Sequence, residues 1–136
     1  MFKLFEIKKF NLDKDIKNIF LTKQNIKKLD KLNHTIGLHS HSHPTRLSEL
    51  NYNQQFKEYY KNKKILEKII GTNKIFSMSH PCGSYNENTL NILKKLNIKL
   101  GFNSHMSEGN KINAENYNLK IAREDYSNVK RKFNLI

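Results

Sequence analysis

The feature that most constrains the fold is a repeated alternation between helix-like segments and short strand-like segments. The strand-like runs are apolar, and the longer runs between them are amphipathic, with apolar residues recurring every three to four positions. The predicted helices cover about residues 22–33, 53–70 and 86–96, and the predicted strands cover residues 35–39, 74–78, 98–102 and 119–122. Strands that alternate with helices are joined as parallel neighbours by helical crossovers. The sequence therefore predicts a single α/β domain, residues 1–136, with about four parallel strands and flanking helices.

Capping residues and glycines set the expected boundaries of these segments. The candidate N-terminal caps are Thr22, Ser48, Asn51 and Asn86. Gly71 follows the longest predicted helix and should end it. Gly101 lies inside the third predicted strand, where a glycine indicates a bend or a close approach of another backbone.

Two loops carry the residues that could bind a metal or take part in a reaction, and both loops follow predicted strands. One loop covers His39 to Pro44, and the other covers Ser79 to Tyr85. Functional residues of parallel α/β folds gather at the carboxyl ends of the strands. We therefore expect the two loops to lie at the same edge of the sheet.

The first loop contains His39, His41 and His43 within five residues. Neutral imidazole is the commonest protein ligand for zinc and similar divalent ions, so a metal site is the leading interpretation. A structural or pH-sensitive histidine cluster is the alternative. Pro44 disfavours helical backbone at His43, so the loop should leave the strand at His39. In that geometry His39 and His43 can converge while His41 points elsewhere.

The second loop is a candidate site for an oxyanion. Pro81 fixes the backbone, Gly83 permits a tight turn, and the backbone N–H of Cys82 can receive an oxyanion. A plain turn between a strand and a helix is the alternative interpretation. Cys82 as a nucleophile paired with His80 is disfavoured, because no third group is evident that would activate the thiol.

The charge and the composition limit the classes of binding partner that the sequence predicts. The formal charge is +13, but nearly all of it comes from lysines spread along the chain, with only three arginines. Nucleic-acid binders more often cluster arginine on one face, so a basic nucleic-acid-binding module is kept only as an alternative. Cys82 is the sole cysteine, which excludes an internal disulfide. No membrane-length apolar run and no signal-peptide core are present, so a cytoplasmic location is the default expectation.

The two loops together resemble two motifs of the polysaccharide deacetylase family, also called the NodB homology domain or carbohydrate esterase family 4. Residues 35–44 resemble the second motif, His-Ser/Thr-x-x-His, and residues 76–86 resemble the third, a strand followed by Pro-aromatic-Gly and Ser-Tyr-Asn. The resemblance is strongest over residues 20–102. It implies that His39 and His43 are ligands of a divalent metal, with zinc expected, and that the second loop binds substrate or oxyanion. The expected residues there are Pro81, Cys82, Gly83 and Tyr85.

The resemblance further implies a distorted (β/α) barrel, here partial, and a hydrolase acting on a carbon–nitrogen bond. Such an enzyme removes N-acetyl groups from a sugar or polysaccharide by metal-activated water, with an aspartate as base and a histidine as acid.

The chain departs from the family pattern at the catalytic residues. The first motif, Thr-Phe-Asp-Asp-Gly or similar, is absent upstream of His39, and Asp13 and Asp15 do not match it. The catalytic residues are therefore unassigned, with His80 and Arg123 as candidates and His105 as a further possibility. We expect an N-terminally incomplete domain of impaired activity, completed by a missing segment or by a second chain. A catalytically inactive remnant that binds metal or carbohydrate is the other alternative.

Overall fold

The computed structural model describes residue 15 and residues 19–104, 117–124 and 126–133. The chain divides into two compact units, residues 1–34 and residues 35–136. In the first unit, helix α3 (Lys23–Lys31) begins at Thr22, whose hydroxyl accepts a hydrogen bond from the backbone N–H of Asn25, so the predicted cap is confirmed. The described part of this unit buries no side chain of α3.

The second unit is built on a parallel sheet. Strands β1 (Ser77–Ser79) and β2 (Leu100–Phe102) pair in parallel, with Met78 opposite Gly101. Isolated parallel bridges join Leu38 to Met78 and Ile121 to Phe102. The chain segments therefore follow one another across the sheet in sequence order, which confirms the predicted parallel α/β arrangement.

The strands are shorter than predicted. The segments at residues 35–39 and 119–122 each contribute a single bridge, and the predicted strand at residues 74–78 is formed only from Ser77 onward. The fourth segment begins instead as a 3-10 turn, η3 (Tyr117–Leu119). A segment that pairs on one side alone has half of the ladder hydrogen bonds of a central strand, so its regular pairing ends sooner.

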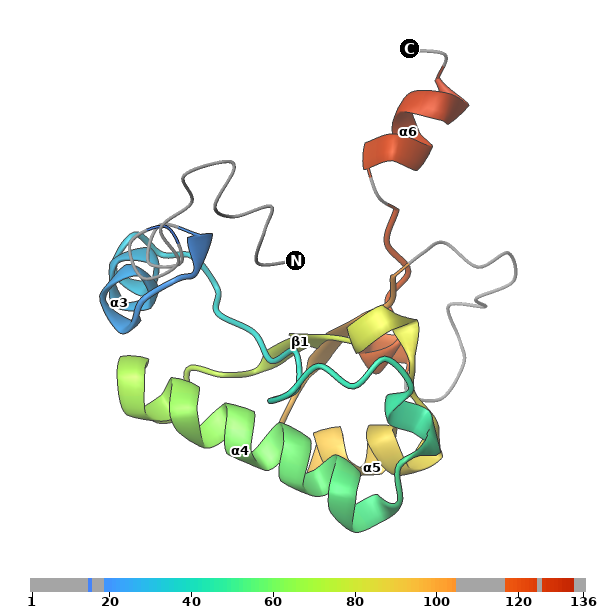
Figure 1. Ribbon diagram of the computed structural model, residues 1–136, viewed down its shortest axis with the longest axis horizontal. Coiled ribbons are helices and arrows are strands. Elements are labelled where there is room, and N and C mark those ends of the chain that lie inside the picture. Colours follow the sequence, from blue (N-terminus) through green and yellow to red (C-terminus); the bar gives the residue numbers. More distant parts are fainter. Residues whose placement is uncertain (1–14, 16–18, 105–116, 125, 134–136) are drawn as a thin grey trace, which may run out of the picture. The chain divides into compact units, whose positions relative to one another are not determined.

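Helices α4 (Tyr52–Ile70) and α5 (Glu87–Lys95) lie side by side against this sheet (Figure 1). Asn51 and Asn86 cap them through side-chain oxygens, and Gly71 ends α4 with a φ of 102°. All three boundary residues confirm the sequence prediction. A further helix, α6 (Tyr126–Lys132), was not predicted, because its short run of polar residues has no apolar stripe.

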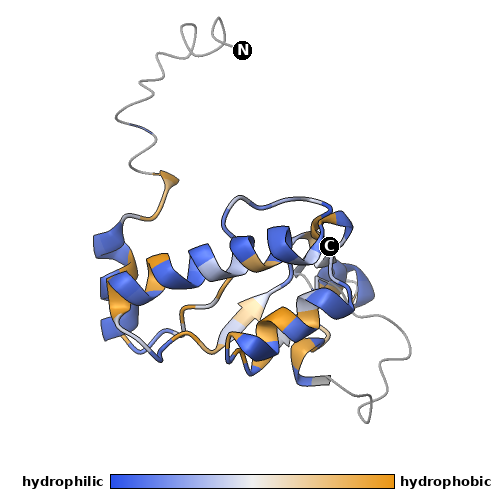
Figure 2. Ribbon diagram, turned by 90° about the horizontal axis from the view of Figure 1, so that it is seen from below, coloured by the Kyte–Doolittle hydropathy of each residue, from blue (hydrophilic) through white to orange (hydrophobic). Residues whose placement is uncertain are grey.

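The core lies between these two helices and the sheet. Figure 2 shows polar and apolar residues alternating around the helices, as amphipathic packing requires. The buried apolar side chains are Leu38, Leu47, Tyr59, Leu66, Ile75, Met78, Leu90, Ile92, Leu93, Leu96, Ile98 and Leu119. None of the helices in the described part of the chain is long and apolar enough to cross a membrane.

Gly101 is required by a close approach inside the sheet, as its position in the strand indicated. A Cβ atom built on Gly101 would stand 2.6 Å from the carbonyl oxygen of Leu119. The segment that carries Leu119 is then held by Ile121, whose N–H donates to the Gly101 oxygen at 2.8 Å. The glycine therefore allows the fourth segment to pack directly against β2.

Candidate metal centre

The histidine loop begins where the first parallel segment leaves the sheet. Leu38 is the last paired residue: its N–H donates to the Ser77 oxygen, and its own oxygen accepts from the Ser79 N–H, both at 2.9 Å. The next N–H, that of His39, donates to Oδ1 of Asn62 on α4 at 3.1 Å. The chain therefore turns away from β1 at His39 and is met there by α4.

His39 and His43 face each other, as the predicted exit of the chain from the sheet suggested. Their ring centroids lie 4.9 Å apart with a tilt of 59° between the planes, and both residues are exposed. Nδ1 of His39 lies 2.9 Å from the carbonyl oxygen of Ser79, the last residue of β1. A carbonyl oxygen only accepts, so Nδ1 of His39 carries a proton in this contact. In the neutral ring that a metal binds, Nε2 is then the nitrogen available as a ligand.

The backbone between the two rings adopts conformations that favour glycine. Ser40 and His43 have φ angles of 61° and 56°. The N–H of His43 donates to Oγ of Ser40 at 3.1 Å, which closes the loop on itself. Pro44 excludes helix here, as predicted, but His43 adopts left-handed rather than extended backbone.

Glu58 on α4 holds the same loop from outside, and the sequence analysis missed it. Its Oε2 accepts from the N–H groups of His41 (2.9 Å) and Ser42 (2.8 Å), and its Oε1 accepts from the Ser42 hydroxyl at 2.9 Å. Partial burial pushes the pKa of Glu58 upward, but the hydrogen bonds from Ser42 and His41 outweigh it and lower the pKa overall. Glu58 lies sixteen residues beyond Ser42 in a lysine-rich helix, so no local pattern singles it out.

The second loop lies beside the histidine pair, at the same edge of the sheet, as the topology predicted. It forms a short 3-10 turn, η2 (Pro81–Gly83), in which Pro81 is buried and Cys82 has a φ of 52°. The N–H of Gly83 donates to the His80 oxygen at 3.1 Å, whereas the N–H of Cys82 has no acceptor among the described residues. A backbone N–H left in this way can bind an anion or a developing oxyanion.

His80 occupies the core rather than the reaction site. It is 1% exposed, its Nε2 lies 2.8 Å from the Leu119 oxygen, and its ring stacks on Tyr85 at 4.4 Å. Burial lowers its pKa, more than the hydrogen bond to Leu119 raises it. A buried, neutral imidazole that supports the loop at residues 81–85 is poorly suited to protonate a leaving group, so this geometry weighs against the candidate catalytic role of His80.

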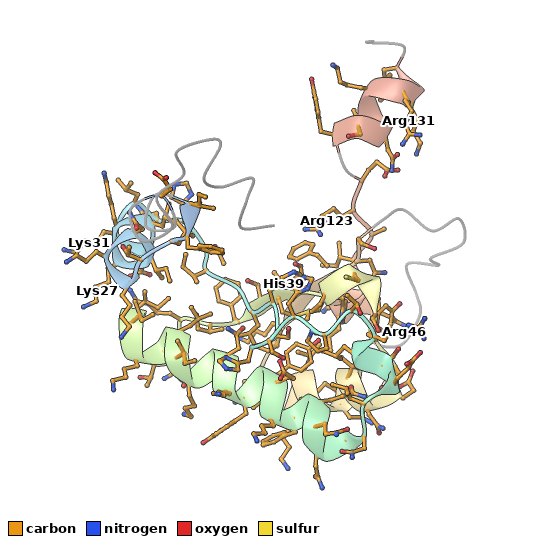
Figure 3. All side chains as sticks on the ribbon, in the orientation of Figure 1. Lys27, Lys31, His39, Arg46, Arg123 and Arg131 are labelled. Atoms are coloured by element: carbon orange, nitrogen blue, oxygen red, sulfur yellow. The ribbon has the colours of Figure 1, made fainter. Side chains whose placement is uncertain are left out.

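The structure gives less information about the other residues considered for a catalytic role. Arg123 is exposed on the segment between η3 and α6 (Figure 3). Its neighbour Glu124 pairs with Lys132 at 3.0 Å. Asp13 and His105 lie outside the described residues.

The donor set that the structure does describe fits a divalent transition metal in part. Two imidazoles, one oriented by a carbonyl, are typical of zinc sites, in which the second nitrogen of the ring is commonly hydrogen-bonded. Catalytic zinc sites take three protein ligands. Within the described residues no group of three His, Cys, Asp or Glu side chains could hold a metal, and His39 and His43 are the two candidate ligands that lie close together.

Comparison with solved structures finds similar folds among deacetylases. The chain superposes on the deacetylase PplD of Streptococcus pyogenes, determined in complex with acetate, with a TM-score of 0.64 and 26% identity over 76% of this chain and 44% of that one. A polysaccharide deacetylase of Bacillus anthracis matches with a TM-score of 0.60 and 20% identity, over 76% of this chain and 32% of that one. A de-N-acetylase of Aggregatibacter actinomycetemcomitans matches with a TM-score of 0.54 and 16% identity, over 84% of this chain and 53% of that one.

These likenesses cover only part of each relative, since the chain spans between 32% and 53% of their lengths. The likenesses to the last two structures, at 20% and 16% identity, indicate a similar fold only. No curated protein sequence matches the chain. The sequence profile of polysaccharide deacetylases, however, matches residues 5–101, well over half of the 136 residues, and so includes both functional loops. On this evidence the chain belongs to the polysaccharide deacetylase family.

Proposed function

We propose that this chain contributes a divalent metal centre to the hydrolysis of N-acetyl groups on a carbohydrate. The observation that carries the proposal is the pair of facing imidazoles, His39 and His43, with centroids 4.9 Å apart at the end of a parallel segment. The hydrogen bond from His39 to the Ser79 oxygen supports it further, because it selects the tautomer that binds metal through Nε2.

The two loops divide the chemistry between them. His39 and His43 would hold the metal, which supplies a Lewis acid for the amide carbonyl and lowers the pKa of bound water. The N–H of Cys82 would receive the negative charge that develops on the carbonyl oxygen. Pro81 fixes the turn that presents this N–H, while Gly83 and the half-buried Tyr85 border it.

The substrate class rests on relatives rather than on a pocket of this chain. The Streptococcus pyogenes relative is a deacetylase determined with acetate, which is the product of removing an acetyl group. An N-acetylated sugar or polysaccharide is accordingly the substrate we propose, with zinc as the metal.

The remaining ligand and the general base would come from outside the described residues or from a second chain. In this proposal the parallel segments form part of a distorted (β/α) barrel that such a segment completes. Arg123 stays a candidate for orienting the base. The alternative is a domain that binds metal or carbohydrate without hydrolysis, which two histidine ligands with no third ligand among the described residues would also serve.

Zinc titration by calorimetry tests the proposal. We expect one zinc ion per chain, with His39→Ala and His43→Ala each weakening binding at least about tenfold, because each removes a ligand. His41→Ala, in the same loop, is the matched control and should leave binding unchanged. Equal affinity in all four proteins would refute the metal centre.

Release of acetate from an N-acetylglucosamine oligomer then separates the enzyme from the binding domain. Zinc-dependent release that disappears in His39→Ala supports hydrolysis. Zinc binding without acetate release, also when the segment or chain that completes the barrel is supplied, supports the alternative. Binding of nucleic acid with a steep dependence on salt would instead favour the basic module considered from the charge.

A further inference from the structure

The carboxylate of Glu58 is committed to the backbone of the histidine loop. It takes three hydrogen bonds, from the N–H groups of His41 and Ser42 and from the Ser42 hydroxyl, at 2.8–2.9 Å. These residues lie between His39 and His43 in the sequence, so Glu58 binds the middle of the segment that joins the two histidines.

Glu58 makes this contact although lysines are close at hand. Lys57 and Lys61 line the same open pocket of about 420 Å³ beside the loop. Among the described residues Glu58 forms no ion pair with either of them. A helical glutamate of this kind commonly pairs with lysine on its own helix. Here the backbone of the histidine loop, and not a lysine, is the partner of Glu58. Charge-assisted hydrogen bonds between a carboxylate and backbone N–H groups are stronger than neutral ones.

The loop needs support from outside because its own backbone is unfavourable. Ser40 and His43 both have positive φ angles, 61° and 56°, which residues with a side chain rarely adopt. Such conformations persist only where the surroundings hold them. Within the loop itself, the bond from the His43 N–H to Oγ of Ser40, at 3.1 Å, is a neutral one.

We propose that Glu58 is a positioning residue, which holds the loop in the conformation that brings the rings of His39 and His43 close together. Asn62, one turn further along α4, fixes the start of the loop through the His39 N–H, and Glu58 fixes its middle. The consequence for metal affinity rests on the proposed metal centre, whereas the consequence for loop conformation does not.

The experiment uses the full chain and a graded set of variants. Ser42→Ala removes one of the three hydrogen bonds, Glu58→Gln replaces one acceptor oxygen by an NH₂ that cannot accept, and Glu58→Ala removes all three. Glu87→Gln is the charge-matched control, since Glu87 is exposed on α5 and makes none of these contacts. Thermal melts of each variant establish that the fold is retained.

The first readout needs no metal. Rings 4.9 Å apart should give a nuclear Overhauser effect between His39 and His43, and the amides of His41 and Ser42 should exchange slowly. We expect both signals in the wild type and in Glu87→Gln, and their loss in Glu58→Ala while the α4 amides stay protected. A ring contact and amide protection that survive in Glu58→Ala would overturn the proposal. If Glu58→Ala does not fold, Ser42→Ala decides the question, because loss of the hydroxyl bond to Glu58 should speed the exchange of the backbone amides at positions 41 and 42, and unchanged rates would overturn the proposal.

The second readout is zinc affinity. Groups that orient metal ligands typically change metal affinity by about 10- to 100-fold when removed, so Glu58→Ala should fall in that range and Ser42→Ala should lose less. If Glu58→Ala binds zinc as tightly as the wild type does, the positioning role of Glu58 is overturned. A wild type that binds no zinc would refute the metal centre, and the ring contact in the metal-free protein would still decide the role of Glu58.

Discussion

Replacing Gly101 by alanine should destabilise this protein strongly, although alanine is otherwise the mildest substitution for a glycine. The new Cβ would stand 2.6 Å from the Leu119 oxygen and 3.0 Å from both the carbonyl carbon and the Cα of Leu119. All three are backbone atoms, so no side-chain rotation relieves the contact. The segment that carries Leu119 has to move away from β2.

The movement would break identifiable hydrogen bonds. The Leu119 oxygen is the partner of Nε2 of His80 at 2.8 Å, and Ile121 makes two backbone bonds of 2.8 Å, one to Gly101 in β2 and one to Asn103 just after it. Overpacking of this kind costs about 1–3 kcal/mol, and leaving the buried imidazole without its partner adds about 1–3 kcal/mol. Since the two costs overlap, we expect a loss of about 2–4 kcal/mol, a large part of the stability of a small domain.

Urea unfolding followed by circular dichroism measures this loss. Gly101→Ala should lower the unfolding midpoint with an unchanged slope. Gly71→Ala is the comparison for strain without crowding: it has open space around it, so its loss of about 1–3 kcal/mol would come from its φ of 102° and ψ of 158° alone. A Gly101→Ala variant within about 0.5 kcal/mol of the wild type would show that Leu119 does not pack on β2 as described.

Three further predictions concern single side chains. Tyr59→Phe should raise the free energy of unfolding by about 1 kcal/mol in urea melts, because the buried Tyr59 hydroxyl has no hydrogen-bond partner in the described structure; destabilisation would contradict this. The hydrogen bond from Lys63 lowers the pKa of Glu67, so its stabilisation is present above a pH of about 4.5 and is lost as the pH falls through the lowered pKa. Urea midpoints should accordingly fall less with acid in Glu67→Gln, and parallel curves would refute the assignment. Cys82→Gly should stabilise by up to about 1 kcal/mol, because φ is 52° there, and a lower melting temperature would argue against that conformation.

The order and type of the elements could be predicted because their signals are local. Asn51 and Asn86 cap helices through contacts three residues away, and Gly71 ends α4 without help from the rest of the chain. Strand lengths were overestimated, since the number of paired residues depends on neighbours in space. The segment at Leu38 is apolar enough for a strand but pairs on one side alone in the described structure.

The candidate site likewise has features that could be predicted from the sequence and features that could not. The convergence of His39 and His43 could be inferred because Pro44 excludes helix and the strand before His39 sets its direction. Glu58 and the burial of His80 could not, because each depends on a partner many residues away, Ser42 in one case and Leu119 in the other. What the two histidines bind stays a prediction.

X-ray absorption at the zinc edge of the zinc-loaded chain tests the central claim most directly. The proposed centre predicts zinc with two imidazole nitrogens at about 2.0–2.1 Å, and loss of one imidazole from the spectrum in His39→Ala and in His43→Ala. His41→Ala should leave the spectrum unchanged. A zinc ion whose imidazole signal survives both substitutions, or falls instead in His41→Ala, would contradict the account.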